Sequence, residues 1–275
     1  MSGIYGGFEE LIYESSALGP GATADPVGIT TRLNPILDPS NINIRGTGRR
    51  GLYSILLGMR QPQFTMDILP TDVDWLREHQ LGQKVIPYLH YKNTSYALKG
   101  LLFIDVTLNR VSVESRHNEA ISATIVAWAE DVEPLMPVDT WSTLTAVEPF
   151  RWLDSTLKIP AEESAWWSWR YEINNNLQRL GNVDDGDTRD IVPRHRDVSG
   201  LIVKDLADFN DWPLLMAEAS EFNITIEVKG DLGPGLGSDV TLLNQDYCRW
   251  GRIEAPVGPE DLQAKRFPFT AIDVT

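Results

Sequence analysis

Asp74-Trp75-Leu76 in the first half of the sequence returns as Asp211-Trp212-Pro213-Leu214 in the second, and Trp212 follows Trp75 by 137 residues in a chain of 275. Around each copy the sequence keeps one order: an extended segment, a polar loop with arginines, a β-rich run, a short helix and further strands. Self-similarity at such a spacing indicates two structural units of one design.

Polar and apolar residues alternate on both sides of each Asp-Trp pair, which predicts β-strands. Short helices are expected at 72–79, with Thr71 as N-cap, and at 210–219. These helices are too few and too short to connect parallel strands, so antiparallel sheets packed as a sandwich or small barrel are expected. The strands are expected at 29–33, 63–68, 85–91, 96–114, 121–129, 169–173, 198–206, 222–228, 240–250 and 267–274.

We therefore predict a mainly β chain with two tandem antiparallel β-sandwich or barrel domains, each with one short α-helix. Residues 1–28, rich in Gly, Ala, Ser and Pro, are expected to be an N-terminal arm with little structure of its own. The first domain is expected at 29–138, a connector at 139–164 and the second domain at 165–275.

Composition limits the classes of function. The formal net charge of −15 disfavours broad binding to a polyanion, because such binding needs clustered Lys and Arg. No apolar run is long enough to predict a membrane span, and no secretory signal is visible at the N-terminus. Cys248 is the only cysteine, so an internal disulfide and a multi-cysteine zinc site are excluded, and we expect a buried thiol.

No chemical motif in the sequence stands in the structural context that its chemistry requires. Residues 46–51 read G-x-G-x-x-G, but a strand-like segment follows where a dinucleotide site needs a helix. The acidic turn at 184–187 lacks the ligand spacing of a calcium loop. The four histidines fall in four segments without an HExxH pair, and no serine lies in G-x-S-x-G. We expect no catalytic residue, cofactor or metal, and therefore not an enzyme.

The segment Trp166-Trp167-Ser168-Trp169-Arg170 has the most unusual local composition. Successive residues of a strand point to opposite faces, so Trp166, Trp167 and Trp169 cannot all be buried on one face of a regular strand. Trp and Arg are enriched at interfaces, so we expect these aromatic side chains at a domain or subunit interface. Ordinary core packing and stacking on a sugar are the alternatives.

Glu172-Ile173-Asn174-Asn175-Asn176-Leu177 resembles the strand-and-asparagine segment that begins the tube domain in tail tube proteins of long-tailed bacteriophages and related archaeal viruses. In the first half, Arg32-Leu33-Asn34-Pro35-Ile36-Leu37 takes the matching place 140 residues earlier. In that family a long loop, strands, one short helix and closing strands follow. Both halves resemble this order from about Gly28 onward, with loops at about 34–50 and 176–196.

The resemblance implies a structural virion protein whose sheets join those of neighbours into rings with a continuous inner barrel. The rings stack into the tail tube, the conduit for genome delivery. Six tube domains usually form one ring, so a tandem repeat implies a homotrimer with pseudo-sixfold symmetry. The implied partners are copies of the chain and other tail proteins such as tape measure, tail tip and terminator. DNA passes through the lumen without specific binding, and the protein belongs to the virion tail, assembled in the host cytoplasm.

Two further expectations concern charge. We expect the two long loops to contact the adjacent ring, with arginines meeting acidic residues there: Arg45, Arg49, Arg50, Arg194 and Arg196. We also expect the −15 charge to be concentrated on the inner wall, where it would repel the phosphate backbone. A tail-tip or baseplate hub ring protein and a carbohydrate-binding β-sandwich module that uses the tryptophans remain the alternative functions.

Overall fold

The structure is a computed structural model, and it describes most of the chain. The second Asp-Trp pair, the helix expected at 210–219 and the glycine-rich segment 46–51 lie outside the described residues. The described residues are 10–38, 42–44, 54–56, 61–93, 99–135, 138–142, 149–159, 162–163, 166–181, 188–205, 221–229, 239–252 and 264–271.

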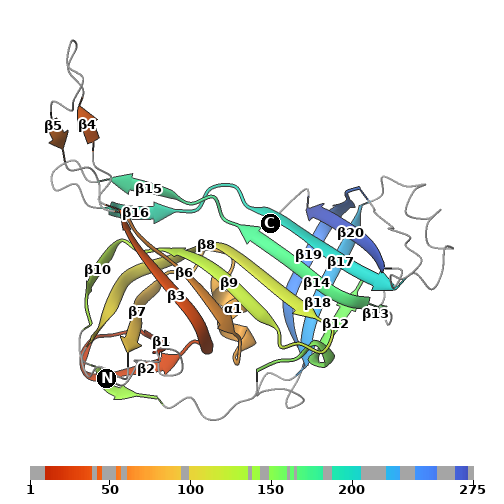
Figure 1. The fold of residues 1–275 in the computed structure, drawn as a ribbon, viewed down its shortest axis with the longest axis horizontal. Helices are drawn as coiled ribbons and strands as arrows, with labels where there is room; N and C mark the ends of the chain where they lie inside the picture. The colour runs from red at the N-terminus through yellow and green to blue at the C-terminus, as the bar shows by residue number, and fades with distance from the viewer. Residues whose placement is uncertain are drawn as a thin grey trace, which may run out of the picture.

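Strands dominate these residues, and in the described part α1 (Val73–His79) is the single α-helix (Figure 1). The prediction of a mainly β chain is confirmed. One turn of 3-10 helix, η1 (Trp152–Asp154), also occurs. The strands are β1 (Glu10–Ser15), β2 (Gly19–Pro26), β3 (Ile29–Asp38), β4 (Ile42–Ile44), β5 (Ser54–Leu56), β6 (Gln61–Leu69), β7 (Ile86–Asn93), β8 (Lys99–Arg116), β9 (Ser122–Trp128), β10 (Asp131–Pro134), β11 (Val138–Trp141), β12 (Ser155–Lys158), β13 (Glu162–Glu163), β14 (Trp166–Asn174), β15 (Gln178–Gly181), β16 (Thr188–Val192), β17 (Asp197–Asp205), β18 (Phe222–Lys229), β19 (Asp239–Trp250) and β20 (Ala264–Ala271).

The two halves of the chain pair their strands in the same order, always antiparallel. In the first half the order is β2-β1-β7-β8-β9-β6-β3. In the second half it is β13-β12-β18-β19-β20-β17-β14. The halves meet where the C-terminal part of β8 pairs with β14, so one sheet runs through both.

Local irregularities also recur at matching places. The pairing register shifts between Thr30 and Arg32 in β3 and between Trp166 and Ser168 in β14, 136 residues later. Both β8 and β19 contain a residue with positive φ at the point where they change partners, Asp105 (49°) and Tyr247 (53°). The register therefore matches Leu33 to Trp169. The match of Leu33 to Ile173 expected from the sequence is therefore wrong by four residues, which is two periods of the strand pleat and leaves the side chains on the same face.

The pairing also changes the expected limits of the units. Residues 10–26 of the predicted arm form β1 and β2, and the predicted connector contains β12 and β13, their counterparts in the second half. β10 and β11 have no counterpart among the described residues of the second half; β11 adds to β2 in parallel. One hydrophobic cluster includes residues of both halves, so the division into two tandem domains stays a prediction.

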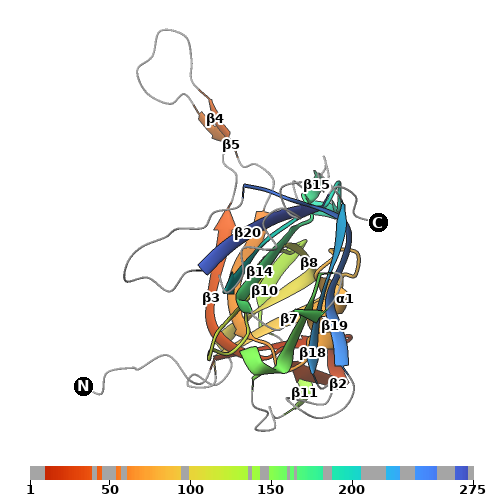
Figure 2. The ribbon, with the colours of Figure 1, turned by 90° about the vertical axis from the view of Figure 1, so that its right-hand side faces the viewer.

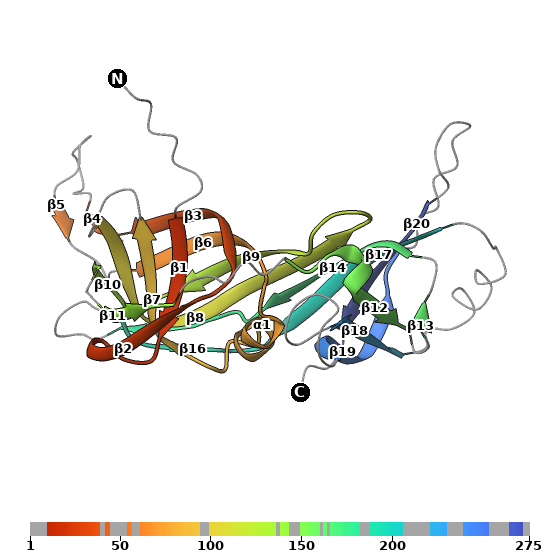
Figure 3. The ribbon, with the colours of Figure 1, turned by 90° about the horizontal axis from the view of Figure 1, so that it is seen from below.

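The long strands of both halves form a layer with one polar and one buried face. β6 shows this pattern most clearly, because every second residue from Pro62 to Ile68 is buried. The buried face packs into the common core, which includes Phe64, Val113, Tyr171 and Phe269. Helix α1 covers this core between the halves and contacts β19 (Figure 3). The helix buries one face, with Val73, Leu76 and His79, and leaves Arg77 and Glu78 exposed.

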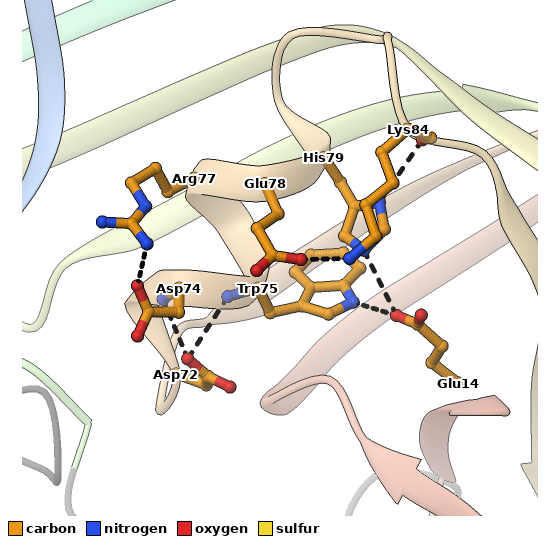
Figure 4. Close-up of polar contacts among 8 residues, drawn as sticks. All are labelled: Glu14, Asp72, Asp74, Trp75, Arg77, Glu78, His79 and Lys84. Carbon is orange, nitrogen blue, oxygen red and sulfur yellow. Dashed lines mark hydrogen bonds and ion pairs between the residues drawn. The ribbon is translucent and has the colours of Figure 1, made fainter. Parts of the chain in front are cut away.

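Helix α1 begins one residue later than expected. The N-cap is Asp72, not Thr71, because the Asp72 carboxylate accepts hydrogen bonds from the backbone N–H groups of Asp74 (2.8 Å) and Trp75 (3.2 Å). The helix is fastened to β1 through Glu14, whose carboxylate accepts a hydrogen bond from the Trp75 indole and lies 3.5 Å from Nε2 of His79 (Figure 4). Burial lowers the pKa of His79, and the nearby Glu14 opposes this shift.

Candidate functional site

The polar face of the long strands is the first candidate surface, and its charges are paired. Nη2 of Arg110 donates to Glu172 at 2.6 Å, and Nη2 of Arg170 lies 3.6 Å from the same carboxylate oxygen. The other pairs on this face are Arg32 with Asp67 at 3.0 Å and Arg116 with Glu114. Among the described residues the face is thus neither strongly acidic nor strongly basic.

A hollow lies in the middle of this face, where β9, β8 and β14 run side by side. Its volume is about 280 Å³. Short serine and threonine side chains line it together with the long side chains of Arg110 and Arg170. The lining residues are Arg110, Ser112, Glu114, Ser122, Thr124, Val126 and Arg170.

Strand β3 forms an open sheet edge, because in the described part of the chain it pairs only with β6. The direction of its backbone groups follows from two prolines. The carbonyl of Pro62 in β6 accepts from Ala129 N–H at 3.1 Å on the β9 side, so residues opposite Pro62 and Phe64 form non-hydrogen-bonded pairs with β6. These residues are Leu37 and Pro35, whose backbone groups therefore point to the open edge. Pro35 fits there because an edge strand tolerates a missing donor.

Short hairpins, β4–β5 and β15–β16, lie between β3 and β6 and between β14 and β17. The second lies within the predicted loop at 176–196, whereas β3 takes the start of the loop predicted at 34–50 and β5 lies beyond its end. In Figure 2, β4 and β5 lie beyond the ends of the long strands. Arg45, Arg49 and Arg50 lie outside the described residues. Arg194 is exposed beside β16, whereas Arg196 is turned inward and donates to the carbonyl of Leu81 at 2.9 Å. Burial lowers the pKa of Arg196.

Arg179 in β15 attaches its hairpin to the first half of the chain, a role that was not predicted from the sequence. Its guanidinium donates to the carbonyls of Ala129 (2.9 Å) and Pro62, and lies 4.8 Å from the ring centroid of Trp128. Burial lowers its pKa to about 10. Arg179 thereby holds the hairpin of the second half on the rim of the first. No motif marks an arginine that binds backbone carbonyls, so only the structure shows this role.

We expect Arg179→Met to release hairpin β15–β16 while the core stays folded, because the substitution removes both carbonyl hydrogen bonds and the contact with Trp128. Limited proteolysis should cut near residues 178–192 about fivefold faster than in the parent chain, since a loss of roughly 1 kcal/mol shifts the local opening equilibrium by that factor. Arg194→Met, at an exposed neighbour, is the control. Equal cleavage of both variants would contradict this anchoring role.

The asparagine segment that carries the resemblance forms a buried turn. Asn175 is 1% exposed; its Nδ2 donates to the carbonyls of Gln80 (3.0 Å) and Leu108 (2.8 Å), and its Oδ1 accepts from Nε of Arg196 (3.3 Å). A Cβ at Gly82, which has φ of +64°, would lie 2.7 Å from Asn175 Nδ2. The turn therefore depends on close contact between the chain after α1 and the chain after β14.

Gln80 continues this network across the junction. Its side chain donates to the carbonyl of Leu242 in β19 at 2.7 Å and accepts from the Tyr171 hydroxyl at 2.8 Å. Full burial raises the pKa of Tyr171 well above its usual range. Buried polar groups that all have partners fix one arrangement of the surrounding elements. The network thus holds the halves in one geometry.

Of the three tryptophans in the segment 166–170, two lie in the core and one is half-buried. The irregular register after Trp166 places Trp166 and Trp169 on the same side, and both are buried. Trp166 packs against Trp152 with ring centroids 5.0 Å apart, and the Trp169 indole donates to Ser155 at 3.3 Å. Trp167 is half-buried, and its ring centroid lies 6.4 Å from that of His117. Packing within the chain therefore accounts for Trp166 and Trp169.

Ser15 and His90 form a close pair, with Oγ and Nε2 2.7 Å apart. The Ser15 hydroxyl donates to the carbonyl of Ala17 at 2.9 Å, so Nε2 of His90 carries the hydrogen and donates to Ser15. This polarity is the reverse of an activated serine nucleophile, and both side chains are buried. Burial lowers the pKa of His90 to about 4.

The low pKa of His90 predicts acid-dependent stability. Unfolding restores a pKa near 6.5, so the unfolded chain binds more protons than the folded chain between pH 6.5 and about 4. Stability should be full above this window and fall through it by up to about 3 kcal/mol. His90→Gln should flatten urea-unfolding free energies over this window, whereas the control His195→Gln at an exposed position should not. An unchanged slope in His90→Gln would contradict the assignment.

Among the described residues, no three His, Cys, Asp or Glu side chains gather as a metal site would need. No helix in the described part is long and apolar enough to cross a membrane. Cys248 is buried as expected, and burial raises its pKa to about 11. No protein-family model matches the sequence, and no curated protein matches it either.

Proposed function

We propose that this chain is a structural subunit of a viral tail tube, whose copies join into rings and whose rings stack around a lumen for DNA. The observation that carries the proposal is the junction between β8 and β14, which joins two like-ordered halves into one continuous sheet. A third and fourth half can be added by the same pairing, because β3 has the place of β14 and its outer edge is open.

Such repetition allows a ring. In it, β3 of one copy would pair with the next copy on the β19 side of its sheet, as β14 pairs with β8 within the chain. The residues that correspond to 110–116 of β8 follow β19 and lie almost wholly outside the described residues. The pairing is head to tail, and such a contact closes into a ring where the rotation from copy to copy completes a full turn, and otherwise gives an open helix. Three copies supply six like-ordered halves, which gives the homotrimer with pseudo-sixfold symmetry. Closure removes the unpaired strand edges, and the polar face becomes the inner wall.

The hairpins support stacking of the rings. β15–β16 leaves the sheet at one end of β14 and β17, with Leu180 exposed, while η1 with exposed Leu153 lies toward the other end of β14 (Figure 1). One ring can therefore receive the hairpins of the next ring. The expectation that the −15 charge is concentrated on the inner wall stays a prediction; with the polar face as that wall, Arg32, Arg110 and Arg170 would offset the carboxylates there.

The proposal assigns the chain no catalytic activity and places it in the virion tail, in contact with copies of itself and with tape measure, tip and terminator proteins. Negative-stain electron microscopy of the purified protein tests it. Tubes of stacked rings are the expected result. Isolated rings would instead indicate a tail-tip or baseplate hub protein, and particles without rings at high concentration would refute both.

A further inference from the structure

The hollow on the polar face has the chemistry of a phosphate site, and the carboxylate of Glu172 lies beside both of its arginines. Arg110 and Arg170 come from neighbouring strands and flank Ser112, whose Oγ accepts from Nε of Arg170 at 3.1 Å. Two guanidinium groups beside hydroxyl groups are the donors that bind phosphate oxygens. Both guanidinium groups here point to Oε2 of Glu172.

We propose that the hollow between Arg110 and Arg170 is a binding site for the phosphate groups of a polyanion, and that Glu172 keeps this binding weak. Glu172 engages Nη2 of Arg110 and lies close to Nη2 of Arg170, so a phosphate that binds both guanidinium groups must compete with this carboxylate. Glu172 is held in place by its strand, so it competes as a permanently bound anion. It is therefore the residue that sets how strongly this face retains a polyanion.

The surrounding charges fit this role. Two further ion pairs lie beside the hollow: Glu114 pairs with Arg116, and Asp67, which accepts from the lining Thr124 at 2.8 Å, pairs with Arg32. The two charges of each pair offset each other, which leaves the local balance to Arg110, Arg170 and Glu172. The side chains of both arginines are about half exposed (51% each), whereas Glu172 is 23% exposed. An incoming anion thus meets the arginines first, and the carboxylate lies behind them.

The inference rests on the proposed function only for its biological meaning, which is that the inner wall of the tube contacts DNA without binding it tightly. The binding itself is a property of the single chain. A wall with unpaired arginines would bind the phosphate backbone of passing DNA. Where each arginine is already paired with a carboxylate, a phosphate only replaces that carboxylate, and the net gain in binding free energy is small. Pairing is thus an alternative to a strongly acidic wall.

The test measures binding of a short fluorescein-labelled single-stranded oligonucleotide by fluorescence anisotropy at low salt. Glu172→Gln frees both arginines with almost no change of shape, and we expect its affinity to rise about tenfold over the parent chain, with a steeper salt dependence. Glu221→Gln is the matched control, because it removes the same charge from another ion pair, with Arg249 at 3.0 Å. Its affinity should rise less than about twofold.

The double variant Arg110→Gln, Glu172→Gln should lose the gain, since one of the two forks is removed. An equal rise in affinity in Glu172→Gln and Glu221→Gln would overturn the inference, because net charge alone would explain it. An unchanged affinity in Glu172→Gln would overturn it too. So would a double variant that keeps the raised affinity. Thermal unfolding confirms that each variant is folded. Electron microscopy separates the two proposals: absent rings refute the proposed function, whereas rings with unchanged oligonucleotide binding in Glu172→Gln refute only this inference.

Discussion

Leu37→Pro should leave the chain folded but unable to form rings. The backbone of Leu37 points to the open edge of β3, so proline there removes a donor that only a neighbouring copy would use. Together with Pro35, the substitution leaves the edge with two missing donors in succession. We expect the concentration needed for ring assembly to rise at least about tenfold, measured by sedimentation velocity.

Ile36→Pro is the matched control, because the backbone of the adjacent residue points to β6 within the same chain. It should destabilise the monomer by about 3 kcal/mol, measured by urea unfolding, whereas Leu37→Pro should cost the monomer less than about 1 kcal/mol. If both prolines weaken the monomer equally, the assigned direction of the backbone groups is wrong. If Leu37→Pro assembles as readily as the parent chain, β3 is not the assembly edge.

Asn175→Ala should produce the largest loss of stability among single substitutions at the junction. It removes two donor contacts and one acceptor contact, and leaves the carbonyls of Gln80 and Leu108 and the guanidinium of Arg196 without that partner in a buried place. Unsatisfied buried groups of this kind cost about 1 to 3 kcal/mol each, with incomplete additivity, so we expect a loss of about 3 to 4 kcal/mol.

Asn176→Gly provides the comparison one residue later. Asn176 has φ of +45°, and its exposed Nδ2 donates to the carboxylate of Asp197 (2.7 Å) and to the carbonyls of His195 (3.1 Å) and Asn174 (3.4 Å). Glycine keeps the backbone conformation and removes only these side-chain hydrogen bonds, which water can replace at an exposed position. We expect a change within about 1 kcal/mol, followed by urea denaturation monitored by tryptophan fluorescence. A small effect of Asn175→Ala, comparable to Asn176→Gly, would show that the buried network does not hold the halves together.

The strands were predictable where side chains alternate. The sequences of β6, β8 and β18 give the two-residue period directly, and the helix start at Asp72 was found to within one residue. The hairpins were hard to find, because β4, β5, β15 and β16 are only three to five residues long and lie close to glycines. β1 was missed although it contains Leu11, Ile12 and Tyr13, because the Gly- and Ala-rich residues after it made the whole segment resemble an arm. Gly19–Pro26 is a strand because β1 and β11 pair with it.

The candidate site was less accessible to sequence reasoning. Trp166 and Trp169 share one side because the pairing register is irregular between them, and a bulge leaves no signal in residue types. The pairing of Glu172 with two arginines depends on β8 and β14 lying side by side, although 62 residues separate Arg110 from Glu172. Net charge is a sum over the whole chain and does not show how charges are distributed between faces.

The most direct test of the account is an electron cryo-microscopy map of the assembled protein at a resolution that separates strands. The account predicts rings of three chains with six like-ordered halves, β3 of each copy paired antiparallel beside the end of β19 of its neighbour, and the polar face with Glu172 lining the lumen. Rings in which β3 remains unpaired, or in which the polar face lies on the outside, would contradict it.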